Sequence, residues 1–209
     1  MSNERKTFDT FNQLRPLLFV ISGHSGAGKD TVIQRMREKN IPIHFVITAT
    51  TRPPRDNEQH GVDYFFFSDD EFAKMIKAGD LIEYAIVYNE YKGVPREQVD
   101  NALWSGKDVV MRVDVQGAAS IRKLYPNAVL IFLVAKDEDE LIRRLKNRKS
   151  ETPEDLRIRI DTARQELERI SEFDYLVVNE DSHLNETVNT ISAIIEAEHH
   201  KIQKQEGEN

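Results

Sequence analysis

Short apolar and β-branched runs alternate with longer segments of helical periodicity along this chain of 209 residues. The short runs predict strands near Leu17–Ser22, Ile43–Ile47, Asp63–Phe67, Ile82–Val87, Val109–Asp114, Val129–Val134 and Tyr175–Val178. The longer segments predict helices near Asp30–Lys39, Asp69–Ala78, Arg96–Ser105, Glu138–Asn147, Pro153–Arg169 and Leu184–Glu198. Such alternation is typical of an α/β fold in which right-handed crossovers join the strands. The wholly apolar run Val129–Val134 favours a parallel sheet that is covered on both faces.

One part of the chain departs from this pattern. From about residue 41 to residue 98 the strands are shorter, and aromatic residues and prolines are frequent. We interpret this stretch as an inserted subdomain. The tail after His200 is polar, and we expect Trp104 and the phenylalanines at 65–67 to serve packing.

Composition and charge narrow the possible functions. With 29 Lys and Arg against 36 Asp and Glu, the formal charge is −7, which makes nucleic acid an improbable bulk partner. The chain contains no cysteine, so disulfides, thiolate metal sites and cysteine nucleophiles are excluded. The polar N-terminus and the shortness of the apolar runs predict no targeting signal and no membrane span, and we expect a cytoplasmic protein.

The strongest motif follows the first predicted strand and opens the first predicted helix, the context that a phosphate-binding P-loop requires. It comprises Gly23, His24, Ser25, Gly26, Ala27, Gly28, Lys29, Asp30 and Thr31. Glycines let the backbone direct its N–H groups inward, and the helix N-terminus adds a partial positive charge. We therefore expect ATP phosphates here, with Lys29 facing the β- and γ-phosphates.

The residue after that lysine departs from the strict motif. Ser or Thr should stand there to bind magnesium, but the chain has Asp30, followed by Thr31. Either residue is a candidate Mg²⁺ ligand.

A second cluster runs from Thr48 to Tyr64, with the pattern T-x-T-T-R-x-P-R-x-x-E-x-x-G-x-D-Y. Its two arginines, Arg52 and Arg55, can grip a phosphate together with the Tyr64 hydroxyl. Glu83, at a predicted strand, can accept two N–H bonds from a base edge, and guanine offers such a pair. Asp114-Val-Gln-Gly117 matches the DxxG of GTPases, but the chain lacks their guanine-reading motif.

With these motifs the chain resembles the guanylate kinase family over about residues 17–198. The resemblance implies a P-loop core with a parallel sheet, an inserted GMP-binding subdomain and a helical lid. Residues 1–16 would then be an N-terminal extension and residues 201–209 a polar tail. Within 17–200 the core would comprise 17–42, 99–136 and 170–200, the insert 43–98 and the lid 137–169.

The resemblance also implies roles for residues. Arg52, Arg55 and Tyr64 would hold the GMP phosphate, while Thr48, Glu83 and Asp114 would meet the guanine. Arg144, Arg148 and Arg159 would clamp the transferring phosphoryl group with Lys29. On spacing alone the lid arginines favour an exposed helix face, because Glu140–Arg144, Asp155–Arg159 and Arg164–Glu168 are i,i+4 pairs.

Further departures from the family pattern lie near the acceptor site. Lys92 stands where a phosphate-contacting tyrosine is usual, Val94 where Ser or Thr is usual, and Arg112 where an acidic residue is usual. We include Lys92 among the candidate GMP ligands. Since Asp30 and Arg112 both change charge, we predict that they form an ion pair across the nucleotide site.

The sequence therefore predicts an enzyme that transfers the γ-phosphate of ATP to GMP or dGMP, with Mg²⁺ accompanying the ATP. It leaves open whether the protein is a monomer or a dimer. One alternative is a related kinase that acts on a sugar bisphosphate such as ribose 1,5-bisphosphate, whose family also has Asp after the P-loop lysine. A second alternative is a non-catalytic guanylate-kinase-like module that binds proteins.

Overall fold

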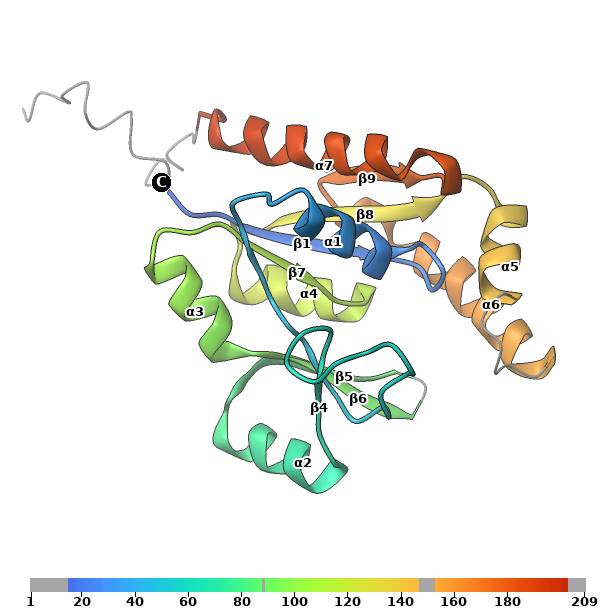
Figure 1. Cartoon of the computed structure of the whole chain (residues 1–209), viewed down its shortest axis with the longest axis horizontal. Coiled ribbons are helices and arrows are strands. Elements are labelled where there is room, and N and C mark those ends of the chain that lie inside the picture. The colour runs from blue at the N-terminus through green and yellow to red at the C-terminus, as the bar shows by residue number, and fades with distance from the viewer. Residues whose placement is uncertain (1–14, 88, 147–152, 203–209) are drawn as a thin grey trace, which may run out of the picture.

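The computed structural model describes residues 15–87, 89–146 and 153–202 (Figure 1). Its strands are β1 (Leu18–Gly23), β2 (His44–Phe45), β3 (Ala49–Thr50), β4 (Phe65–Phe66), β5 (Leu81–Val87), β6 (Glu90–Pro95), β7 (Val109–Arg112), β8 (Val129–Ala135) and β9 (Tyr175–Asn179). Its α-helices are α1 (Lys29–Glu38), α2 (Asp69–Ala78), α3 (Arg96–Trp104), α4 (Val115–Leu124), α5 (Glu138–Lys146), α6 (Pro153–Leu167) and α7 (Leu184–His199). Within the described ranges, no helix combines the length and the apolar character that a membrane span requires.

Five strands form the central sheet in the order β2-β7-β1-β8-β9, and every pair in it is parallel. All six residues of β1 are buried, as expected for a strand in the middle of a covered sheet. Because the strands are parallel, their carboxyl ends lie along one edge, where Gly23, Arg112, Ala135 and Asn179 end their strands. In open α/β sheets this edge is where ligands bind.

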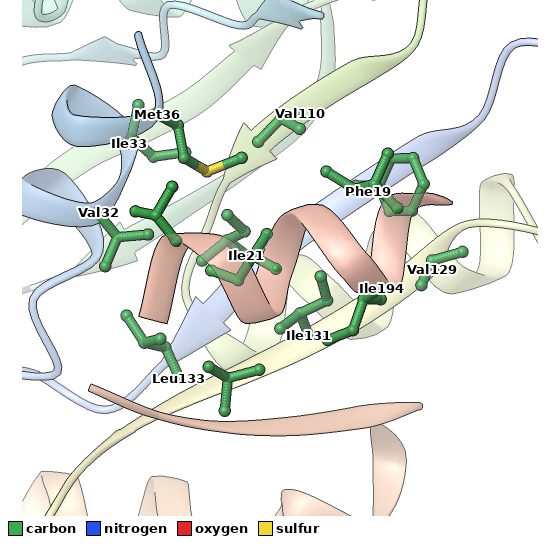
Figure 2. Close-up of a cluster of buried hydrophobic side chains, with 14 of the residues drawn as sticks. Phe19, Ile21, Val32, Ile33, Met36, Val110, Val129, Ile131, Leu133 and Ile194 are labelled. Atoms are coloured by element: carbon green, nitrogen blue, oxygen red, sulfur yellow. The ribbon is translucent and has the colours of Figure 1, made fainter. Parts of the chain in front are cut away.

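Helices cover both faces of this sheet. On one face, side chains of α1 and α7 pack against alternate residues of β1 and β8, including Ile21 and Ile131 (Figure 2). On the other face, α3 and α4 pack against the intervening residues, such as Val20 and Leu130. The predicted α/β fold with a parallel core sheet is confirmed.

A second sheet lies below the core in Figure 1, with the order β4-β3-β6-β5 and helix α2 against it. Phe72 of α2 is fully buried between this helix and the sheet. The helix begins with a capping box between Ser68 and Glu71 and ends at Gly79, whose φ of 74° is left-handed. These local signals explain why α2 was predictable.

Helices α5 and α6 form a separate pair beside the carboxyl edge of the central sheet (Figure 1). Leu141 and Leu145 of α5 are buried with Ala163 of α6 and Ala135 at the end of β8. Both helices fall within residues 137–169, the stretch that we predicted to be a lid.

Some expectations differ from the structure. His44–Phe45, which we assigned to the insert, pairs with β7 in the core sheet, and strands β3 and β6 and helix α4 were not predicted. The expectation that Trp104 packs was wrong, since its side chain is 93% exposed at the end of α3.

Candidate active site

The P-loop connects β1 to α1 as predicted. Gly28 caps the helix with a φ of 88°, a left-handed conformation that favours glycine. A Cβ atom there would lie 2.4 Å from Nδ2 of Asn179. The same Asn179 amide donates to the Ala27 carbonyl at 2.8 Å. The end of β9 therefore packs directly against the loop, and only glycine fits between them.

His24 ties the loop to the end of β8. Its Nε2 accepts the Ala135 backbone N–H at 3.0 Å, so its Nδ1 carries the proton and donates to the Ser25 carbonyl at 2.7 Å. The ring is buried, and burial lowers the pKa of His24 to about 4. The imidazole is thus neutral, faces the protein interior and braces the loop.

Lys29 is folded over the loop. Its Nζ donates to the carbonyls of Gly23 at 2.5 Å and His24 at 3.1 Å. Burial lowers the pKa of Lys29, and the carboxylate of Glu166 is the strongest opposing charge. Glu166 reaches from α6 and accepts the Ser25 backbone N–H at 3.0 Å, while burial raises the pKa of Glu166 itself.

Two arginines predicted to grip a phosphate lie beside one carboxylate. Nη2 of Arg52 contacts both Glu58 oxygens at 2.8 Å, and the Arg55 backbone N–H donates to Glu58 at 2.9 Å. The Arg52 guanidinium also lies 5.4 Å from the centre of the Tyr64 ring. Arg52, Arg55 and Tyr64 are therefore brought together, with Glu58 as the anion between the two arginines.

The predicted pair between Asp30 and Arg112 is confirmed. Nη1 of Arg112 lies 2.9 Å from Oδ1 of Asp30, and the guanidinium lies 4.2 Å from the centre of the Tyr64 ring. The Tyr64 hydroxyl donates to the same Asp30 oxygen at 3.4 Å. Burial, followed by the charge of Asp30, raises the pKa of Tyr64 to about 12.

The candidate base-reading residues line the same cavity as the P-loop and the two arginines. Glu83, on β5, is buried, and burial followed by the charge of Asp114 raises its pKa to about 7. Asp114 caps α4 by accepting the Gly117 N–H at 2.7 Å. Thr48 is also buried, and burial lowers the pKa of Lys92 on β6.

Most of these groups line one cavity of about 400 Å³ between the two sheets, whereas His24 and Glu58 do not line it. Of the candidate site residues, it contains Ser25, Gly26, Gly28, Lys29, Asp30, Thr31, Thr48, Arg52, Arg55, Tyr64, Glu83, Lys92, Asp114 and Arg159. A P-loop, a pair of arginines and a buried carboxylate thus share one site. That arrangement can hold two phosphorylated molecules with their phosphates adjacent.

Comparison with known proteins identifies the family. The guanylate kinase family model matches residues 15–198. The chain belongs to the guanylate kinase family. It is 47% identical over 191 residues to guanylate kinase 2, chloroplastic/mitochondrial, from Oryza sativa subsp. japonica, covering 91% of this chain and 67% of the relative. It is 42% identical over 182 residues to the guanylate kinase of Caldanaerobacter subterraneus subsp. tengcongensis, covering 87% of each.

Solved structures agree with this assignment. The crystal structure of guanylate kinase from Anaplasma phagocytophilum superposes with a TM-score of 0.76 at 29% identity. The match covers 91% of this chain and 90% of that one. The guanylate kinase fold therefore extends over the core, the second sheet and the α5–α6 pair.

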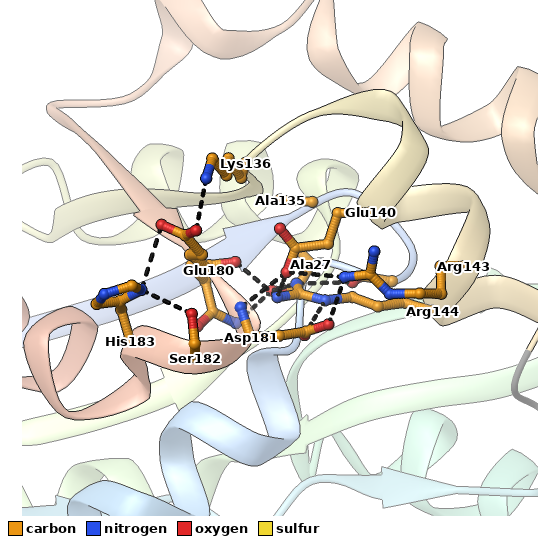
Figure 3. A network of polar contacts seen from close by, with 12 residues as sticks. Ala27, Ala135, Lys136, Glu140, Arg143, Arg144, Glu180, Asp181, Ser182 and His183 are labelled. Atoms are coloured by element: carbon orange, nitrogen blue, oxygen red, sulfur yellow. Dashed lines mark hydrogen bonds and ion pairs between the residues drawn. The ribbon is translucent and has the colours of Figure 1, made fainter.

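Within this guanylate kinase fold, Arg144 lies outside the large cavity. Its guanidinium donates to the carbonyls of Ala27 at 3.2 Å and Asn179 at 2.7 Å, and to Glu140 and Asp181 at 2.5 and 2.7 Å (Figure 3). It lines a smaller adjoining hollow of about 220 Å³, next to Gly26, Gly28 and Thr31. The expected Glu140–Arg144 pair is present, and it holds the arginine against the P-loop.

The other lid arginines differ in position. Arg159 of α6 lines the large cavity with the P-loop residues. Arg148 lies outside the described residues. Arg164 extends away and bonds Glu138 of α5 at 2.5 Å.

Sequence reasoning missed two carboxylates of this guanylate kinase site. Glu166 lies on α6 among several other acidic residues, and no spacing distinguishes it from an exposed neighbour. Glu58 stands within the second motif, between the two arginines and Tyr64, so its place there was a usable signal. Its pairing with Arg52 depends on how the chain turns between these two residues, and only the structure shows that turn.

Proposed function

We propose that the protein transfers the γ-phosphate of ATP to GMP or dGMP, giving ADP and GDP or dGDP. The observation that carries this proposal is the shared cavity, in which the P-loop faces the arginine pair and the buried Glu83. Membership of the guanylate kinase family supports the same reaction. The reaction is that of a nucleoside monophosphate kinase.

The acceptor end of the cavity suits guanine. Deprotonated Glu83 offers two oxygens to the adjacent N–H groups of guanine, and Thr48 and Asp114 lie near enough to line the same space. Arg52, Arg55 and Lys92 would then meet the phosphate of the nucleotide. A buried, hydrogen-bonding site of this kind rejects bases that leave its polar groups unpaired.

Transfer requires position and charge more than covalent help. An oxygen of the acceptor phosphate attacks the γ-phosphorus, and the bond to the β-phosphate oxygen breaks, so that ADP leaves. Lys29 neutralises the β- and γ-phosphates. To do so, its Nζ leaves the loop carbonyls that it contacts in this structure. Arg159 would meet the charge spread over the moving group, as we propose for Arg144 and Arg148 when the lid closes.

Magnesium would enter with ATP. Among the described residues there is no group of three or more His, Cys, Asp or Glu side chains that could hold a metal ion. Mg²⁺ bound to nucleotides needs few protein ligands, and the Thr31 hydroxyl lines the cavity beside Lys29. Asp30 is the weaker candidate because Arg112 engages its carboxylate. When bound, the ion would offset the negative charge of the ATP phosphates.

The remaining features are proposals of the same kind. We propose the division into a core, a GMP-binding insert and a lid, and partners limited to ATP and GMP or dGMP, without nucleic acid or membrane. We also propose a role in purine nucleotide metabolism and a cytoplasmic location, although the rice relative is named for chloroplasts and mitochondria.

A coupled assay of ADP release tests the proposal. The wild-type chain is given Mg²⁺–ATP with GMP, dGMP, AMP, UMP, CMP or ribose 1,5-bisphosphate. We expect turnover with GMP and dGMP at rates at least about a hundredfold above the other acceptors, because discrimination by a buried polar site reaches this range. Turnover of the sugar phosphate alone, or of no acceptor, would contradict the proposal.

A further inference from the structure

Arg112 joins three segments that are far apart in sequence. It ends β7 of the core sheet, Asp30 lies in the first turn of α1, and Tyr64 precedes β4 of the second sheet. The Arg112 side chain is 11% exposed and lines the large cavity. This arginine therefore stands between the P-loop and the acceptor end of the site.

The Arg112 guanidinium contacts both the first turn of α1 and the segment that precedes β4. Nη1 meets Oδ1 of Asp30 at 2.9 Å, and Nη2 donates to the Asp63 carbonyl at 2.5 Å. The Cζ atom of the guanidinium lies over the Tyr64 ring, 4.2 Å from its centre. The residue that carries the candidate phosphate-binding hydroxyl is thus fixed at its ring and through the preceding carbonyl.

Stability alone explains this arrangement poorly. Arg112 Nε is buried and has no hydrogen-bond partner among the described residues. A buried donor left without an acceptor costs about 1–3 kcal/mol, and an apolar side chain could fill the same space without that cost. An interaction with a functional consequence gives a reason for keeping the guanidinium.

We infer that Arg112 is a positioning residue for the acceptor phosphate. By holding Tyr64 against the first turn of α1, it sets the distance between the acceptor's phosphate and the Lys29 end of the site. The inference rests on the proposed function, and it adds a role for a residue whose sequence pattern predicted only the ion pair with Asp30. Because small misplacements slow transfer strongly, we expect Arg112 to govern acceptor binding and turnover more than ATP binding.

The test compares Arg112→Met, which keeps the length of the side chain but removes the three contacts, with Arg112→Lys, which keeps the charge. Arg122→Met is the matched control. Arg122 also bonds one carboxylate, Asp174 at 2.5 Å, together with the carbonyls of Pro126 at 3.1 Å and Ala128 at 2.8 Å, but it does not line the cavity. For each variant, kcat, KM for GMP, KM for ATP and Tm are measured.

We expect Arg112→Met to raise KM for GMP about tenfold and to lower kcat/KM for GMP by about thirtyfold or more, with KM for ATP within about threefold of wild type. Arg112→Lys should recover part of the loss. Arg122→Met should lower Tm and leave both KM values unchanged. In a cycle with Asp30→Asn, the double variant should lose less than the product of the two single losses.

Other results would overturn the inference. A lower Tm for Arg112→Met with KM for GMP unchanged would show that Arg112 stabilises the fold and does not position the acceptor. Equal rises in KM for GMP and ATP, or purely multiplicative losses in the cycle, would show no specific link to the acceptor. A wild-type chain that leaves GMP unphosphorylated would overturn the proposed function, and this inference with it. Wild-type activity therefore separates the two failures. If Arg112→Met does not fold, Arg112→Lys gives the same comparison, with an unchanged KM for GMP counting against the inference.

Discussion

Glu83→Gln provides the sharpest test of how the acceptor site works. Burial and the neighbouring Asp114 raise the pKa of Glu83 from its ordinary 4.5 to about 7. Between these two values the folded chain holds a proton that the unfolded chain releases. The free energy of unfolding therefore falls as the pH rises from about 4.5 to about 7.

The size of this loss follows from the shift. A displacement of roughly 2.5 pH units corresponds to about 3 kcal/mol at the upper limit, since each unit is worth about 1.4 kcal/mol. Glutamine has nearly the same shape and carries no charge at either pH. We therefore compare the free energy of unfolding of Glu83→Gln with that of wild type at each pH. This difference should be about 2–3 kcal/mol more in favour of the variant at pH 8 than at pH 5. Urea unfolding at both pH values measures the difference, and the cost of burying the new amide cancels between them.

Binding should show the opposite trend. Only the carboxylate accepts both guanine N–H groups, so wild-type affinity for GMP should rise about tenfold between pH 6 and pH 8, beyond the change caused by the ligand's own phosphate. Titration calorimetry with wild type and Glu83→Gln separates these effects, because the phosphate titrates identically with both proteins. Parallel pH profiles for the two proteins, in stability or in GMP binding, would refute the reasoning.

Three other predictions follow from the same geometry. Lys29→Met should lower kcat by about 10²–10³-fold, whereas Lys39→Met at the far end of α1 should leave it unchanged; similar activity in the two variants would count against the role of Lys29. Gly117→Ala should raise KM for GMP several-fold and leave KM for ATP unchanged, since its Cβ would lie 3.0 Å from Oε2 of Glu83; equal KM values for wild type and variant in the coupled assay would contradict this. Because of His24, the free energy of unfolding should fall as the pH falls from 6.5 towards 4. The pKa of this buried ring is lowered to about 4, so the unfolded chain binds the proton more readily than the folded chain. Urea unfolding at pH 5 and pH 7 should show a smaller difference for His24→Asn, and an unchanged difference would exclude His24 as the source.

The core was predictable because its signals are local. Strands such as β8 are apolar throughout, and the P-loop lies between an apolar strand and a helix, as its chemistry requires. The second sheet was harder to predict. Strand β6 contains Glu90, Lys92, Gly93 and Pro95, which show no alternation, and it exists because it pairs with both β3 and β5.

Gly93 illustrates why such a strand escapes prediction. A Cβ atom at this position would lie 2.9 Å from the tip of Phe72 and 3.1 Å from the Glu83 carbonyl. The need for glycine thus comes from close packing by α2 and β5, and the residues next to Gly93 in the sequence give no sign of it. Helix α4 was missed because its first turn reads as the loop motif Asp114-Val-Gln-Gly117.

The candidate site divides in the same way. Its candidate phosphate-binding residues were found from motifs, and the link between Asp30 and Arg112 from their paired changes of charge. The engagement of Arg144 with two loop carbonyls was not predictable, because periodicity gives a helix face and not the neighbour that the face meets. Glu166 was missed for the same reason.

The pairing of Arg52 with Glu58 has a consequence for selectivity. The positive charge of Arg52 is already paired with the Glu58 carboxylate. A phosphate that binds there would therefore replace one anion with another. A small inorganic anion gains little by this exchange, since it replaces a carboxylate that is already bidentate and well placed. In the proposed function, a nucleotide would add contacts through its base elsewhere in the cavity, and these contacts would supply the free energy that displaces the carboxylate. We therefore expect the whole ligand to set the selectivity of this site, and free phosphate or sulfate to occupy it more weakly than a nucleotide.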